Sequence, residues 1–154
     1  KAEDLNTQAN AALRNGYYTH GVLDLIKGKD YDNALRMLED WEYNFPTEKL
    51  RGFSSLQRGR INYLNGKYDE TVKQAKNFIL VNPSTTYIAD FYMLIGAACY
   101  KKGESEQSLK YYSRVVTLCP ESPKGRQAEK IIKRLRALPQ LNSTSSGVNR
   151  APRP

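Results

Sequence analysis

The chain has 154 residues, 40% of them hydrophobic, and a formal net charge of +8. One domain is expected at this length. The longest uninterrupted apolar run, residues 93–100, is much shorter than the roughly 20 residues of a membrane-spanning helix, so composition excludes a membrane span. The charge is unevenly distributed, because residues 1–120 carry 16 basic and 14 acidic side chains whereas residues 121–154 carry 8 basic and 2 acidic ones.

Apolar residues follow a helical period along most of the chain. Residues 5–25 are expected to form one long first helix, although Gly16 interrupts it. Further along, apolar side chains recur at spacings of three and four, which is the pattern of one buried helix face. No useful stretch of residues 1–138 alternates with a period of two, so we predict an all-α fold. The predicted amphipathic helices include residues 34–41, 56–64, 69–81, 91–100, 109–116 and 124–138.

The residues that end these helices recur at a fixed spacing. Pro46, Pro83 and Pro120 follow one another at intervals of 37 residues, and proline cannot continue a helix. Gly66 and Gly103 are also 37 residues apart, and they stand where a first helix must end in a tight turn, which suits glycine. Self-similarity of this kind indicates a repeated unit of two helices.

A second pair of glycines lies inside the predicted helices. Gly59 and Gly96 are again 37 residues apart, although a glycine in a helix interior costs about 1 kcal/mol relative to alanine. We expect the compensating gain to be close approach of the partner helix. The residues expected to face them are also small, namely Ala34, Thr71 and Ser108.

The third copy carries the clearest family resemblance. It resembles a tetratricopeptide repeat in the run 96–103 and then at Ser108, Leu109, Tyr112, Val115 and Pro120. The resemblance implies an all-α, tetratricopeptide-type α-solenoid of about three helical hairpins with a C-terminal capping helix. The expected helical repeat domain covers residues 1–138, with repeats at about 14–46, 52–83 and 89–120 and the capping helix at 123–138.

The spacing of 37 residues is longer than the family's period of about 34, and the extra residues follow the prolines. In this respect the chain is similar to bacterial envelope repeat proteins, which include outer-membrane assembly lipoproteins and the periplasmic coordinator of the Tol–Pal system. The similarity slightly favours the bacterial periplasm or envelope over the cytoplasm.

The resemblance also implies a function. In this family the first helix of each pair lines a concave groove, so we expect a non-catalytic module or scaffold that binds a peptide or partner protein, within a multi-protein assembly. Aromatic grooves with a few cations suit extended or helical peptides. The groove residues implied by the register are Tyr18, Leu56, Arg60, Tyr63, Met93, Tyr100 and Lys101.

The basic C-terminal end supports an alternative function. Its cations could dock on nucleic acid or another anionic surface, although a capping helix needs a polar outer face in any case. No aromatic residue is interleaved with these cations, which argues against a stacking platform for nucleic-acid strands. The basic patch consists of Lys130, Lys133, Arg134 and Arg136.

Residues that could carry chemistry are few. His20 is the only histidine, and no recognisable nucleophile or orienting group accompanies it. Cys99 and Cys119 have no CxxC spacing, which disfavours a zinc site and leaves open whether they form a disulfide. Gly59 to Lys67 lacks the spacing and the Ser or Thr of a phosphate-binding loop. The sequence therefore predicts no catalytic residue, no cofactor and no metal.

Beyond the last predicted helix the composition changes. Residues 139–154 are rich in proline, serine, glycine and asparagine, and we expect a disordered tail there. Three repeats also expose apolar ends. Self-association therefore remains a further possibility beside a protein or peptide ligand.

Overall fold

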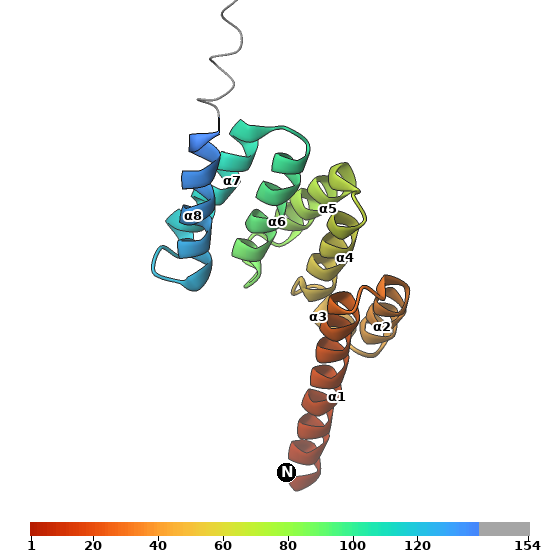
Figure 1. Cartoon of the computed structure of the whole chain (residues 1–154). Coiled ribbons are helices and arrows are strands. Elements are labelled where there is room, and N and C mark those ends of the chain that lie inside the picture. Colours follow the sequence, from red (N-terminus) through yellow and green to blue (C-terminus); the bar gives the residue numbers. More distant parts are fainter. Residues whose placement is uncertain (139–154) are drawn as a thin grey trace, which may run out of the picture. The chain divides into compact units, whose positions relative to one another are not determined.

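The computed structural model describes residues 1–138, and the predicted tail at 139–154 lies outside the described residues. Helices make up 82% of the described part, which contains no strand, so the prediction of an all-α fold is confirmed. Neighbouring helices pack as hairpins, which is consistent with a helical-repeat solenoid. The helices are α1 (Ala2–Lys27), α2 (Tyr31–Asn44), α3 (Pro46–Lys49), α4 (Phe53–Leu64), α5 (Tyr68–Val81), α6 (Ile88–Lys101), α7 (Ser105–Leu118) and α8 (Pro123–Ala137) (Figure 1).

The described part of the chain divides into two compact units, residues 1–88 and the residues from 89 onward. In the first unit α1 packs against α2 and α4 packs against α5. The core of the α1–α2 hairpin contains Val22, Leu38 and Trp41, and the ring of Phe53 at the start of α4 lies 5.4 Å from the Trp41 ring. The indole N–H of Trp41 donates a hydrogen bond to the Asn15 side chain, which satisfies the polar atom of this buried residue.

Helix α1 is longer than predicted, and Gly16 does not interrupt it. A Cβ built on Gly16 would meet nothing within 4 Å, so the residue costs the helix only its weak propensity, about 1 kcal/mol relative to alanine. Residues 1–14 are all exposed. The long first helix therefore extends well beyond the part that packs on α2.

The residues on either side of Pro83 close the first unit by polar contacts. The Thr85 hydroxyl donates to the Arg51 carbonyl at 2.6 Å, and the Asn82 side-chain amide donates to the Leu50 carbonyl at 2.9 Å. These bonds tie the end of the second hairpin back to the segment that precedes α4. The extra residues of the long repeat thus make specific contacts instead of forming an open loop.

The second unit contains the clearest repeat. The Ser108 hydroxyl of α7 donates to the Gly96 carbonyl of α6 at 2.8 Å, and a Cβ built on Gly96 would lie 2.9 Å from the Tyr112 ring. The expected close approach between this glycine and a small partner residue is therefore observed. On its other side α7 packs against α8, around a core of Tyr112, Val115, Ala128, Ile132 and Leu135.

Helix α8 begins with a cap of the predicted type. The Ser122 hydroxyl accepts from the Gly125 N–H at 3.0 Å and donates to the Cys119 carbonyl at 2.8 Å, and Pro123 occupies the first helical position. The two bonds of Ser122 join the end of α7 to the start of α8. The orientation of α8, and of the side chains at its far end, depends on this short connection.

Candidate functional site

The predicted groove residues fall into both units. In the first unit Tyr18, Arg60 and Tyr63 are half-buried. Each of them contacts a neighbour: the Tyr18 ring lies 6.3 Å from that of Phe45, and the Tyr63 ring lies 5.5 Å from that of Tyr68. These side chains keep part of their surface accessible to a ligand.

Leu56 requires a correction. Its side chain is only 1% exposed, so the expectation that it lines a ligand-binding groove is wrong. The register of the repeat places Leu56 on the first helix of its hairpin, but an apolar side chain at that position gains more from burial than from contact with water. It belongs to the interior of the fold.

The groove residues of the second unit are more accessible. Met93 is half-buried, Lys101 is exposed, and Tyr100 at the end of α6 is 45% exposed. Tyr100 also forms one wall of a pocket of about 500 Å³, which we call the α8 pocket. The pocket is lined by Tyr100, Tyr112, Ile131, Arg134, Leu135, Ala137 and Leu138.

The α8 pocket joins two sites that the sequence patterns kept apart. Tyr100 belongs to the predicted groove and Arg134 to the predicted basic patch, yet both line the same pocket. Sequence reasoning missed Leu138 as a site residue because it was assigned to the apolar face of a capping helix. The spacing of Ile131, Leu135 and Leu138 was visible, but periodicity does not show which part of a face remains uncovered by a neighbour.

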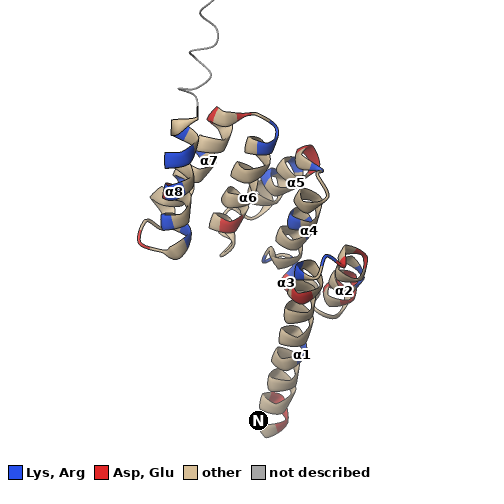
Figure 2. Cartoon of the chain, in the orientation of Figure 1, with Lys and Arg blue, Asp and Glu red and all other residues tan. Residues whose placement is uncertain are grey.

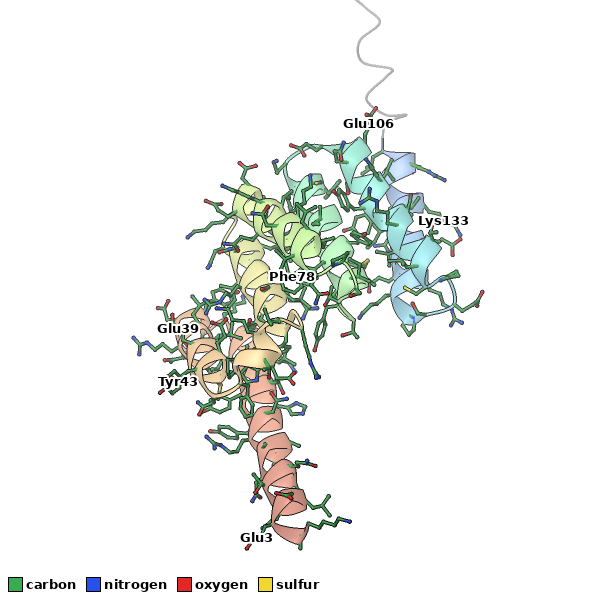
Figure 3. All side chains as sticks on the ribbon, turned by 180° about the vertical axis from the view of Figure 1, so that it is seen from behind. Glu3, Glu39, Tyr43, Phe78, Glu106 and Lys133 are labelled. Carbon is green, nitrogen blue, oxygen red and sulfur yellow. The ribbon has the colours of Figure 1, made fainter. Side chains whose placement is uncertain are left out.

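Lys and Arg residues recur along α8 (Figure 2). These cations differ in whether a carboxylate lies close to them. The Lys124 ammonium lies 2.7 Å from an Asp90 carboxylate oxygen, and Arg126 pairs with Glu121 at 3.9 Å. Lys133 pairs with Glu129 at 3.8 Å, and its side chain projects outward from α8 in Figure 3.

The cations near the C-terminal end of α8 are not neutralised in this way. Within residues 1–138, Lys130, Arg134 and Arg136 form no ion pair. Cations in the last turn also stabilise the helix through its dipole. This stabilisation accounts for their presence in the helix but leaves their charge available to an anionic partner.

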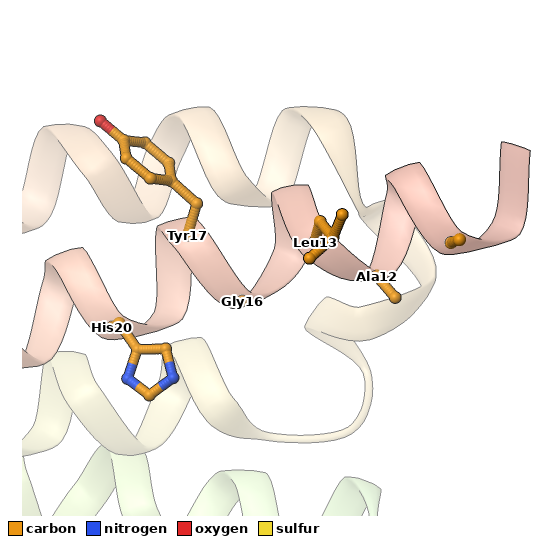
Figure 4. A pocket seen from close by; sticks show the side chains of 6 residues that line it. Ala12, Leu13, Gly16, Tyr17 and His20 are labelled. Carbon is orange, nitrogen blue, oxygen red and sulfur yellow. The ribbon is translucent and has the colours of Figure 1, made fainter. Parts of the chain in front are cut away.

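A larger but more open hollow lies along α1 (Figure 4). It has a volume of about 730 Å³, and its lining residues all belong to this one helix: Ala9, Ala12, Leu13, Gly16, Tyr17 and His20. Leu13 and Tyr17 are 72% and 70% exposed. Apart from His20 and the Tyr17 hydroxyl, the lining of this hollow is an apolar face of the helix.

Neither cysteine forms a disulfide in the structure. Cys99 is a buried free thiol and Cys119 a partly buried one. The Cys119 thiol donates to the Val115 carbonyl at 3.4 Å, as expected of a thiol at a helix end. Among the described residues, no group of three or more His, Cys, Asp and Glu side chains could hold a metal ion. No helix in that part of the chain has the length and apolar character needed to cross a membrane.

An electrostatic cluster joins three helices of the first unit. The Glu42 carboxylate at the end of α2 accepts from Arg58 of α4 at 3.3 Å and lies 3.6 Å from the Lys49 ammonium of α3. Burial acts to raise the pKa of Glu42, but the hydrogen bond and charge of Arg58, together with the charge of Lys49, outweigh it and lower this pKa below its ordinary value. The cluster holds helices together and is not arranged as an acid–base pair.

No protein-family model matches the chain, and no curated protein matches it either. What the chain binds is therefore inferred from the surfaces described above.

Proposed function

We propose that this chain is a non-catalytic protein-interaction module of the tetratricopeptide type, which binds a peptide or partner protein within a larger assembly of the kind found in the bacterial envelope. The observation that carries the proposal is the α8 pocket. It is formed by side chains of three helices, and two of these side chains, Tyr100 and Leu138, are each 45% exposed.

The composition of the pocket favours a protein ligand. Its lining is apolar and aromatic except for Arg134, and binding sites of this type combine apolar walls with a few polar groups that fix orientation. A ligand that covers Tyr100 and Leu138 removes apolar surface from water, which is worth roughly 25 cal/mol for each Å² buried. Tyrosine and arginine are also the residue types that dominate binding energy at protein interfaces.

The test is recovery of a partner by the full chain and by two variants. The chain is immobilised and exposed to a lysate of its source, and the recovered protein is purified and titrated by calorimetry. We expect the double variant Tyr100→Ala, Leu138→Ala to bind that protein at least about tenfold more weakly, because two apolar contacts are lost. Tyr43→Ala is the matched control, since Tyr43 is 88% exposed and lies on α2, outside the pocket.

The far-UV circular dichroism of both variants serves as the check on folding. Equal affinity of the double variant, the control and the native chain would remove the pocket from the proposed function. The predicted groove residues of the first unit, Tyr18, Arg60 and Tyr63, would then become the next candidates.

A second candidate function is docking on nucleic acid or an anionic surface through α8. The observation that favours it is the absence of ion pairs at Lys130, Arg134 and Arg136 within the described residues. Binding of this kind releases counterions, so its affinity falls steeply as salt is added. An affinity for nucleic acid that does not change with salt concentration would exclude it.

A further inference from the structure

The α8 pocket is graded from a buried floor to an exposed rim. Tyr112 and Leu135 form the floor and are almost fully buried, whereas Tyr100 and Leu138 form the rim. The Tyr112 ring is fixed by its close contact with Gly96. A volume of about 500 Å³ with a fixed floor is suited to one or two large apolar side chains.

The charge beside the pocket has a single sign. Arg134 lines the pocket, and Lys130 lies four residues earlier on α8, which places it one turn away on the same side of the helix. Neither has an ion-pair partner among residues 1–138. The other cations of this helix outside its last turn, Lys124, Arg126 and Lys133, each have a carboxylate within 4 Å. The uncompensated positive charge of α8 is therefore concentrated at the pocket and the helix end.

We propose that the α8 pocket binds an acidic peptide segment of a partner protein. A large apolar side chain of that segment, such as leucine, isoleucine, phenylalanine or methionine, occupies the pocket, and neighbouring Asp or Glu carboxylates pair with Arg134 and Lys130. The guanidinium group can accept a carboxylate in a two-bond geometry that gives orientation as well as affinity. This inference rests on the proposed function and names the class of its ligand.

The apolar pocket distinguishes this ligand from other anions. A phosphate backbone would use the cations but leave the apolar pocket unfilled. The chain's own residues 139–154 contain Arg150 and Arg153 and no acidic residue, so their charge has the wrong sign. A ligand with both an apolar and an acidic part matches all of the lining.

The experiment is selection from a displayed library of random peptides. The library is passed over the full chain, over Arg134→Gln, over Leu138→Asp and over the control Arg126→Gln. Arg126 is an exposed arginine on the same helix that pairs with Glu121 outside the pocket, so the control removes the same charge. Selected peptides are synthesised with a fluorescent label, and their affinities are measured by anisotropy. The helicity of each variant is measured, and Tyr100→Ala replaces Leu138→Asp if the latter does not fold.

The native chain and Arg126→Gln are expected to select the same peptides, rich in Asp and Glu around one large apolar residue. Arg134→Gln should weaken their binding about tenfold, because it removes a charge-assisted hydrogen bond, and Leu138→Asp should weaken it at least as much. Peptides without acidic residues, or affinities that both pocket variants leave unchanged, would overturn this inference and leave the proposed function standing.

Failure of the proposed function gives a different result. If no peptide is enriched on the native chain, this inference fails, and recovery of no partner protein by the immobilised chain shows in addition that the proposed function fails. Poly(U) RNA and phosphatidylserine vesicles are tested in parallel with the selected peptides. Tighter binding of either, weakened by Arg134→Gln but not by Tyr100→Ala, which changes no charge, would assign the cations to an anionic surface and overturn the peptide inference.

Discussion

The atoms that lie next to a glycine determine whether this chain can accept alanine at that position. A Cβ built on Gly125 would lie 2.0 Å from the Cys119 carbonyl oxygen and 2.9 Å from the carbonyl carbon. These are backbone atoms in the tight connection between α7 and α8, and they cannot move aside as the tip of a side chain could. Gly16 is the opposite case, because its surroundings are open.

The two glycines therefore give opposite predictions for the same substitution. Gly125→Ala should lower the free energy of unfolding by about 2 kcal/mol, because overpacking at a fixed site costs about 1–3 kcal/mol. Gly16→Ala should raise it by about 0.5–1 kcal/mol through helix propensity. Urea unfolding followed by circular dichroism measures both. An equal effect of the two substitutions would show that close contact with Cys119 is not the reason why residue 125 must be glycine.

At this scale the sequence identified some glycines and missed others. Gly66 and Gly103 were predicted to end helices in left-handed turns, and their φ angles of 76° and 80° agree. Gly125 was not noticed, because it does not recur at the repeat spacing and nothing in its sequence neighbours reveals a carbonyl group nearby. Close approach in three dimensions leaves no local signal unless a repeat shows it more than once.

At the scale of helices, polar contacts fix elements that hydrophobic packing leaves loosely defined. Glu42 is the example, because its carboxylate contacts side chains from α3 and α4 as well as lying on α2. Sequence reasoning treated Pro46 only as the end of a helix, whereas the structure shows that it also begins the short α3. Periodicity needs several turns to appear, so it could not predict a helix of four residues.

The Glu42 cluster predicts a dependence of stability on pH. The pKa of Glu42 is lowered in the folded state. The contribution of Glu42 to the free energy of unfolding is therefore fully present above the unfolded-state pKa of about 4.3. This contribution is lost as the pH falls through the lower pKa that Glu42 has in the folded state. Glu42→Gln should therefore cost about 1–2 kcal/mol at pH 7, and the cost should shrink at acidic pH.

The matched control for this prediction is Glu39→Gln, since Glu39 is an exposed residue of the same helix. The comparison is made by chemical unfolding of the native chain and both variants at pH values from about 3 to about 7, which span the range in which carboxyl groups titrate. A cost of Glu42→Gln that stays constant with pH would show that the cluster does not depend on the ionised carboxylate. A cost at Glu39 as large as that at Glu42 would contradict the role of Arg58 and Lys49.

At the scale of the whole chain, the sequence predicted the class of fold better than the candidate site. The repeat spacing and the helical period concern contacts between neighbours in sequence, and these survive in the α1–α2, α4–α5 and α7–α8 packing. The α8 pocket depends instead on where helix ends meet, which brings Tyr100 together with Arg134. The sequence contains both residues but no pattern that relates them.

A chain built from neighbouring hairpins should not unfold as one body. In repeat architectures stability is approximately a sum of local terms and nearest-neighbour terms, and each of the two compact units has its own buried cluster. Trp41, the only tryptophan, lies in the core of the first unit, so its fluorescence reports on that unit. Circular dichroism reports on helices throughout the chain.

Ile132→Ala separates these two signals. Ile132 is buried in the α7–α8 core of the second unit, and truncation of a buried isoleucine to alanine costs about 2–5 kcal/mol. We expect the urea midpoint measured by circular dichroism to fall clearly, while the midpoint measured by Trp41 fluorescence falls much less. Leu38→Ala in the first unit is the reciprocal control and should lower the fluorescence midpoint at least as much as the circular-dichroism midpoint. Equal shifts of both midpoints in both variants would mean that the two units unfold together, because coupling between neighbouring hairpins would then exceed the stability of either unit alone.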